Sequence, residues 1–291
     1  MTIEKISNVA SLEEHQSAIY SLLQEFDRIC KVLDIPYILF AGTMLGAVRH
    51  EGFIPWDDDL DILMLREDYN RFLQNAEEVL DKERFFIQKE FSDHWPMFFS
   101  KLRLNGTTCL EKYHPKDKKI HHGVYIDIFP CDNTYKTTLG KKIQFMASKV
   151  IIAKSLDKRG YITDSVVKKI FMQVCKFLPL APFLALAKGG SSKSSEVHSF
   201  LAAAKSYDKN IYPRHYLTDR VNLKFENEYY PVSAEYDKLL QMLYGDYMIL
   251  PSPDEREDKR HVVLVDLHHS YEHYEKYHND LEFDVLTKSI R

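Results

Sequence analysis

A carboxylate inside an apolar strand constrains this chain more than any other feature of its sequence. The run WDDDLD (56–61) leads directly into the apolar segment 60–65, which has the length and character of a buried strand. Residues two apart on a strand project to the same face, so Asp59 and Asp61 are expected side by side. Two carboxylates held that close repel each other and are costly to bury unless a cation lies between them. A solvated acidic turn ahead of the strand is the alternative, and the place of Asp61 inside the apolar run argues against it.

A third carboxylate has the same setting. Asp127 is flanked by Ile126 and Ile128 in the apolar run 124–129, the last clear strand pattern before Pro130. Carboxylates on neighbouring strands suit Mg²⁺ or Mn²⁺, which prefer oxygen ligands and substrate phosphates. Two such ions can clamp the attacking and leaving oxygens of an in-line phosphoryl displacement. Asp59, Asp61 and Asp127 are therefore the predicted metal ligands.

The composition limits the class of protein. Of the 291 residues, 45% are apolar and 28% charged, which allows a sizeable core. The formal charge of −4 argues against a general nucleic-acid binder, so no nucleic-acid partner is expected. The four cysteines match no zinc spacing and are typical of reduced core thiols. The first residues show no signal-peptide pattern, and a cytoplasmic protein is expected.

The order of elements predicts an α+β fold, with a small mixed sheet flanked by helices and a helix-rich C-terminal half. Strand patterns occupy 37–41, 60–65, 85–91, 98–104 and 124–129, and helical patterns occupy 11–34, 44–49, 66–80, 138–158, 164–187, 192–207 and 234–244. Ser11 with Glu14 forms a capping-box pattern at the start of the first helix. We expect a catalytic core over 1–135 and a helical region over 136–291 packed on it. The segment 171–187 contains Lys176, Pro179 and Pro182, which favours a kinked core helix. A peripheral contact with the inner membrane face is the alternative.

Gly42 and Thr43 lie between the strand pattern 37–41 and the helix pattern 44–49. Glycine permits close approach of the backbone to a ligand, and helix N-terminal amides with a hydroxyl can cradle a phosphate. Such a pair alone carries no information. A strand, Gly-Thr, a helix and then the aspartate pair some sixteen residues later together resemble the nucleotidyltransferase superfamily.

The resemblance extends to one family within that fold. The segment AGTMLGAVRHEGFIPWDDDLDI (41–62) looks like the signature of the LicD family, bacterial phosphotransferases related to the eukaryotic fukutins. YIDIFP (125–130) is similar to a second motif of that family. YYP (229–231), YDKLL (236–240) and YGDYM (244–248) are similar to its C-terminal signature. The likeness is strongest before residue 130, and the middle helices carry no motif.

The resemblance implies transfer of a substituted phosphate from a CDP-activated donor, with CDP-choline first among the candidates, to a sugar hydroxyl. The acceptor would be a glycan or a lipid-linked glycan, as in a teichoic acid. Asp59, Asp61 and Asp127 become the catalytic residues, and Asp127 is also placed to help deprotonate the acceptor. Gly42 and Thr43 would bind the donor phosphate.

Three further residues are predicted to contact the donor. Arg49, inside the first motif, would neutralise a donor phosphate, although a surface helix position is the plain alternative. Trp56 beside the acids would stack on cytosine or choline, or else pack as a wall. Lys101 lies on a strand near the acids and is assigned a phosphate role, with a solvated strand face as the alternative.

Two other functions fit the same residues. In nucleotidyl transfer the attack falls on the α-phosphorus of an NTP and pyrophosphate leaves, with the same catalytic acids. In a pseudoenzyme the fold binds a nucleotide only as a scaffold, although the presence of all three acids argues against it. The residues name neither the donor alcohol nor the acceptor.

Overall fold

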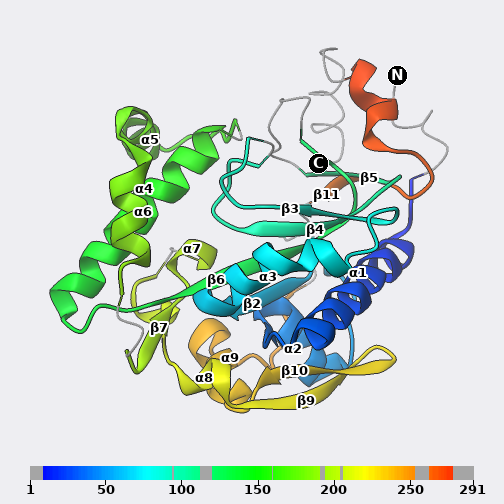
Figure 1. Cartoon of the computed structure of the whole chain (residues 1–291). Helices are drawn as coiled ribbons and strands as arrows, with labels where there is room; N and C mark the ends of the chain where they lie inside the picture. Colours follow the sequence, from blue (N-terminus) through cyan, green and yellow to red (C-terminus); the bar gives the residue numbers. More distant parts are fainter. Residues whose placement is uncertain are drawn as a thin grey trace.

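A seven-stranded mixed sheet lies at the centre of the part of the chain that the structure describes (Figure 1). The structure is a computed structural model and describes residues 9–93, 95–111, 120–158, 160–190, 194–203, 206–252 and 262–277. The strands are β1 (Ile38–Leu39), β2 (Asp61–Leu65), β3 (Phe85–Gln88), β4 (Ser100–Leu104), β6 (Tyr125–Asn133), β7 (Glu196–His198) and β8 (Ile211–Pro213). Five of them follow the order β1-β2-β6-β4-β3, and β7 and β8 continue from the end of β6. The predicted α+β class is confirmed.

Two helices, α1 (Leu12–Leu33) and α3 (Arg66–Val79), lie beside each other on the sheet (Figure 1). The expected capping box of Ser11 and Glu14 starts α1, because each side chain accepts from the other residue's backbone N–H. The face of α1 toward the sheet is fully buried at Ile19, Leu22, Leu23, Phe26 and Ile29. This packing holds β4 and β6 under α1, and β6 carries the predicted ligand Asp127.

The helix predicted over 44–49 begins earlier, as α2 (Ala41–His50), directly after β1. The loop after α2 turns back against it, since a Cβ added at Gly46 would lie 2.4 Å from the carbonyl oxygen of Gly52. Only glycine allows that approach. The acidic run 57–61 therefore returns to the start of α2, where Gly42 and Thr43 lie.

The central strand β6 runs through Pro130 to Asn133, so the prediction that Pro130 stops it is wrong. On one side of β6, pairing with β4 ends at Ile128 and pairing with β7 starts at Asp132. Pro130 lies in the gap between these two partners, where a missing N–H breaks no ladder bond on that side. The extension carries the chain out of the sheet toward the C-terminal helices.

The helices after the sheet are α4 (Thr138–Lys158), α5 (Val166–Phe177) and α6 (Leu180–Lys188), in green in Figure 1. The single helix predicted over 164–187 is thus two helices, bent by 103° at their junction. Pro179 causes the break because it disfavours helical geometry at the residue before it, and Leu178 is extended with ψ 141°. The prediction of a core helix is wrong for α5, which buries only Met172 and Cys175.

The rest of the chain holds more strand than the sequence indicates. The segment 192–207, predicted as a helix, contains β7 and a short helix, and residues 191–193, 204 and 205 lie outside the described residues. The remaining elements are β5 (Thr108–Glu111), α7 (Phe200–Ala203), 3₁₀ helix η2 (Asp208–Asn210), α8 (His215–Thr218), β9 (Arg220–Phe225), β10 (Glu228–Ser233), α9 (Tyr236–Tyr244), β11 (Val262–Asp266) and 3₁₀ helix η3 (Tyr271–Tyr277). The main core takes side chains from both sides of residue 135, including Ile151 and Tyr230. The division at 135 stays a prediction.

Candidate active site

The strands β2 and β6 are parallel neighbours, and their register places Asp61 directly opposite Asp127. On the other side of β6, Lys101 of β4 is the residue opposite Asp127. The predicted strand over 60–65 begins at Asp61, so Asp59 lies in the loop before it rather than on the strand face. Two of the three predicted ligands therefore share the centre of the sheet, and the third enters from the adjoining loop.

The ionised form of the Asp61 carboxyl group is destabilised by its surroundings. Burial raises its pKa well above the usual range, and the negative charges of Asp59, Asp127 and Asp57 raise it further. The ammonium of Lys101 acts in the opposite direction and is the smallest of these effects. Among the described residues, burial and these three carboxylates thus outweigh the opposing effect of Lys101 on the Asp61 carboxyl.

Lys101 is fully buried beneath the acids. Its Nζ lies 3.1 Å from Oδ1 of Asp127 and 3.4 Å from the carboxylate of Glu111, and 3.1 Å from the centroid of the Tyr125 ring. Burial raises the pKa of Asp127, and Lys101 partly offsets that effect. This position identifies Lys101 as the internal counter-ion of Asp127. A direct contact of Lys101 with donor phosphate stays a prediction.

Gly42 and Thr43 hold the start of β2 in place. The backbone N–H of Asp61 donates to Oγ1 of Thr43 at 2.8 Å, and Thr43 is itself buried. A Cβ added at Gly42 would lie 2.9 Å from Oδ2 of Asp57. The glycine therefore leaves room for an acidic side chain beside the first turn of α2. The predicted binding of donor phosphate at these two residues is not tested by these contacts.

The remaining acids of the run have different surroundings. Asp58 is buried, and its Oδ2 accepts from the backbone N–H of Val262 in β11 at 3.0 Å. The backbone oxygen of Asp57 accepts from the side chain of Gln16 in α1 at 2.9 Å. Asp58 thus fixes the loop from within, whereas the carboxylate of Asp57 acts electrostatically on Asp61.

Arg49 and Trp56 lie at the end of α2 and in the loop that follows. Nη1 of Arg49 donates to the backbone oxygen of Tyr247 at 2.6 Å. The ring of Trp56 meets that of His50 edge to face, with centroids 6.2 Å apart. Arg49 therefore joins the first motif to the C-terminal motif 244–248. Roles of both residues in donor binding stay predictions.

Two residues near the acids were not predicted as site residues. Desolvation of its hydroxyl, followed by the charges of Asp61, Asp57 and Asp59, raises the pKa of Tyr244, while the residue as a whole is 46% exposed. Glu111 of β5 shares Lys101 with Asp127. The Tyr-Gly-Asp-Tyr run indicates Tyr244 only through family resemblance, and Glu111 has no sequence signal, since its role depends on pairing across strands.

The carboxylate oxygens of Asp59, Asp61 and Asp127 are suitable ligands for a divalent cation. Within the described residues, no three His, Cys, Asp or Glu side chains already converge on one point that could hold a metal ion. The crowding that raises the pKa of Asp61 is nevertheless the effect that a bound cation would reverse. Oxygen-only ligands would favour Mg²⁺ or Mn²⁺ over softer metals. The metal stays a prediction that rests on charge and ligand type.

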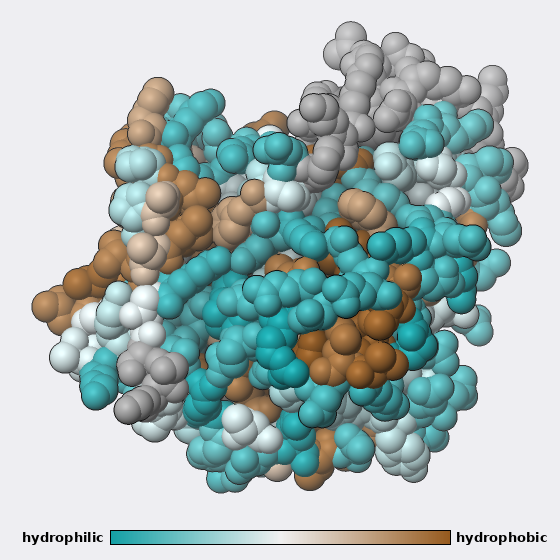
Figure 2. Space-filling view, in the orientation of Figure 1, coloured by the Kyte–Doolittle hydropathy of each residue, from teal (hydrophilic) through white to brown (hydrophobic). Residues whose placement is uncertain are grey.

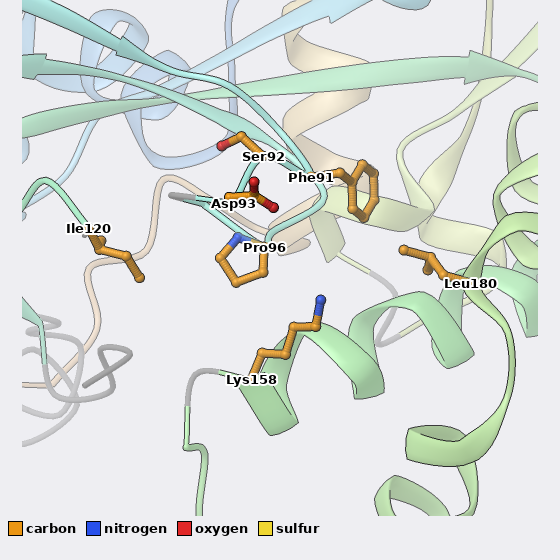
Figure 3. Close-up of a pocket in the computed structure, with 7 residues that line it drawn as sticks. All are labelled: Phe91, Ser92, Asp93, Pro96, Ile120, Lys158 and Leu180. Atoms are coloured by element: carbon orange, nitrogen blue, oxygen red, sulfur yellow. The ribbon is translucent and has the colours of Figure 1, made fainter. Parts of the chain in front are cut away.

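Two pockets in the described part of the chain lie apart from Asp59, Asp61 and Asp127. Phe91, Asp93 and Lys158 are among the residues that line the first, a cavity of about 340 Å³ between the β3–β4 loop and helices α4 and α6 (Figure 3). The second has a volume of about 750 Å³ and lies between α1, α3 and the β9–β10 hairpin. None of the predicted site residues lines either one.

Replacement of Thr43 by valine is expected to destabilise the protein by about 1–3 kcal/mol, because the N–H of Asp61 then loses the Thr43 hydroxyl as its acceptor in a buried setting. The variant T43S keeps the oxygen and is expected to retain wild-type stability within about 1 kcal/mol. Chemical denaturation of both variants measures the difference. Equal stability of T43V and T43S would show that this hydrogen bond does not hold β2.

Comparison with known proteins agrees with the motifs. Residues 34–156 match the family model described as LicD/FKTN/FKRP, nucleotidyltransferase domain. The lipopolysaccharide cholinephosphotransferase LicD of Haemophilus influenzae is 26% identical over 277 residues, which covers 87% of this chain and 96% of that protein. An uncharacterized protein of Rickettsia typhi is 42% identical over 130 residues, covering 44% of this chain and 38% of its own length.

The matched region runs from the end of α1 into α4 and contains the whole sheet centre with Asp59, Asp61 and Asp127. The C-terminal motif adds Tyr244 and the backbone of Tyr247 to the same neighbourhood. Residues 34–156 match the nucleotidyltransferase domain of the LicD family, and the similarity to the Haemophilus influenzae protein extends over most of the chain.

Proposed function

We propose that this chain transfers phosphocholine, or a related substituted phosphate, from a CDP-activated donor to a sugar hydroxyl of a surface glycan precursor and releases CMP. The pairing of Asp61 with Asp127 across parallel strands is the observation that carries the proposal. It places two carboxylates opposite each other at the centre of a domain that matches the LicD family model. The similarity to a cholinephosphotransferase over 96% of that protein supports phosphocholine as the first group to test.

In the proposed reaction the acceptor oxygen attacks the donor phosphorus that carries choline. A phosphorus–oxygen bond forms there, and the bond from that phosphorus to the bridging oxygen breaks, so that CMP leaves with the bridging oxygen. Asp127 would accept the acceptor's proton, and Lys101, whose Nζ lies 3.1 Å from its Oδ1, would favour the ionised form of its carboxylate and orient it. Mg²⁺ or Mn²⁺ held by Asp59, Asp61 and Asp127 would supply the charge neutralisation that a diphosphate requires.

The rest of the site would bind and orient the donor. Gly42 and Thr43 lie at the start of α2, where backbone amides favour phosphate. Trp56 and Tyr244 supply aromatic surface beside the acids, which suits a cytosine ring or a quaternary ammonium group. Arg49 would add a positive charge at the far end of α2.

The experiment is a CMP-release assay with Mg²⁺, a sugar acceptor and, in turn, CDP-choline, CDP-glycerol and CDP-ribitol. We expect turnover with at least one donor and the highest rate with CDP-choline. A teichoic acid precursor and a lipopolysaccharide-type glycan are the acceptors to compare. Pyrophosphate release from CTP or ATP in place of CMP release would establish nucleotidyl transfer instead. Nucleotide binding without any turnover would establish a scaffold.

A further inference from the structure

The helices α4 to α6 expose an unusual share of the molecule's apolar side chains. Among the described residues, twenty large hydrophobic side chains are exposed, and eleven of them lie between Leu139 and Leu186. Figure 2 shows the result as a broad apolar area over these helices, at the left of the view. A patch of this kind on a soluble domain marks an interaction surface.

The centre of this area is one side of α5. Val166, Ile170, Val174 and Phe177 follow one another at helical spacing and are 67%, 60%, 57% and 83% exposed, with Val167 beside them. These five residues are called the α5 face. The opposite side of α5, Met172 and Cys175, packs on Val150 and Ala153 of α4 in a cluster separate from the main core.

The direction of the α5 face is fixed by contacts with α4. Nζ of Lys154 donates to the carbonyl oxygens of Cys175, Lys176 and Leu178 at 3.0, 3.0 and 2.7 Å. These bonds satisfy the carbonyl groups at the end of α5 and tie that end to α4. The apolar side of α5 is therefore held outward while its other side is packed.

Lysines accompany the apolar face. Between residues 136 and 188 the sequence has eleven Lys or Arg and two Asp, in a chain whose net charge is −4. Exposed members include Lys168, Lys169 and Lys176 on α5 and Lys142 on α4. A short helix with an outward apolar side and flanking lysines suits the headgroup region of a bilayer with anionic lipids.

We infer that the α5 face docks on the surface of an anionic phospholipid bilayer and lies in its interfacial plane. No single helix in the described ranges is both long and apolar enough to cross a membrane, and α5 with α6 reaches that length only across a 103° bend. The helix α5 has 12 residues, about 18 Å, which is shorter than a bilayer core. Charge favours the bilayer over a second copy of this chain, since two copies of this basic segment would repel each other.

The test is co-sedimentation of the full chain with vesicles of phosphatidylcholine alone and with vesicles that also contain about 30% phosphatidylglycerol. We expect binding to the anionic vesicles and at least about fivefold weaker binding to the neutral ones, because each lysine near the surface contributes about that factor. Binding is expected to fall at high salt. Equal binding to both vesicles, or none to either, would overturn the inference.

Variants distinguish vesicle binding through the α5 face from non-specific hydrophobic binding. I170Q/V174Q is expected to weaken anionic-vesicle binding by at least about tenfold. The control V32Q/M248Q replaces two equally exposed apolar residues elsewhere, 60% and 59%, and should bind as the wild type does. Circular dichroism checks that each variant is folded. A dimer in sedimentation that I170Q/V174Q dissociates, with no vesicle binding, would assign the face to a second copy.

The inference stands apart from the proposed function. With a water-soluble acceptor, I170Q/V174Q should release CMP at the wild-type rate, since the α5 face is not among the residues placed at the acids. Loss of vesicle binding with unchanged turnover supports docking alone. Absence of turnover in the wild type with intact vesicle binding would reject the proposed function and leave the docking inference in place.

Discussion

The variant D127N is expected to release CMP at least about a thousandfold more slowly than the wild type. A metal ligand contributes several kcal/mol of charge stabilisation, and each 1.36 kcal/mol is a factor of ten. The amide also cannot accept the acceptor's proton. Steady-state CMP release at saturating Mg²⁺ measures the effect. Asparagine has the same shape, and Glu111 remains as a counter-ion for Lys101, so the fold is expected to persist.

The matched control is D93N. Asp93 is exposed and lines the cavity of about 340 Å³ in Figure 3, which contains none of the predicted site residues. We expect D93N to retain activity within about twofold, because a surface substitution away from the chemistry changes little. A large loss in D93N with normal turnover in D127N would move the active site from the sheet to that cavity.

The sequence predicts the centre of the site because local patterns decide it. Asp61 and Asp127 each interrupt an apolar strand run, and the parallel pairing of those runs places the two residues opposite each other. The segment 41–62 adds family resemblance at the same place. The prediction of α1, with its capping box, rests on equally local chemistry.

What the sequence does not predict depends on contacts between distant segments. In the sequence pattern Pro130 indicates the end of a strand. The strand β6 nevertheless continues, because its partner on one side changes there from β4 to β7. In the sequence Lys101 cannot be told from a solvated strand residue. Its burial is explained by the carboxylates of Glu111 and Asp127, which lie on other strands. The separation of α5 from the main core likewise follows from its packing, chiefly on α4. Hydrophobic periodicity does not distinguish such packing on one side from burial on both sides.

Without divalent cations, the variant D61N is expected to melt at a higher temperature than the wild type above neutral pH. Burial and the neighbouring carboxylates hold the pKa of Asp61 in the folded protein well above the usual value of about 3.9 for an aspartate. The folded protein therefore keeps a proton that the unfolded chain has lost, so the wild type loses stability as the pH rises from about 4 through the folded pKa. Asparagine carries no charge at any pH and removes this loss.

The difference in Tm between D61N and the wild type should therefore be small near pH 4 and grow toward pH 8. We expect at least about 2 °C at pH 8, since 1 kcal/mol shifts Tm by about 2–4 °C in chains of this size. The control D164N replaces an exposed carboxylate outside the acid group and should leave Tm unchanged within about 1 °C. Thermal melts at several pH values in a chelating buffer measure all three proteins.

Addition of Mg²⁺ should reverse the order. A ligand that binds only the folded state raises Tm, so the wild type should gain stability with Mg²⁺ concentration while D61N gains much less. Stabilisation by D61N together with loss of CMP release would show a trade-off between stability and activity. Repulsion between the carboxylates would lower the stability of the folded protein, and activity would require them. Parallel melting curves for D61N and the wild type at every pH would remove the electrostatic basis for a cation at this site, even if D127N proved inactive.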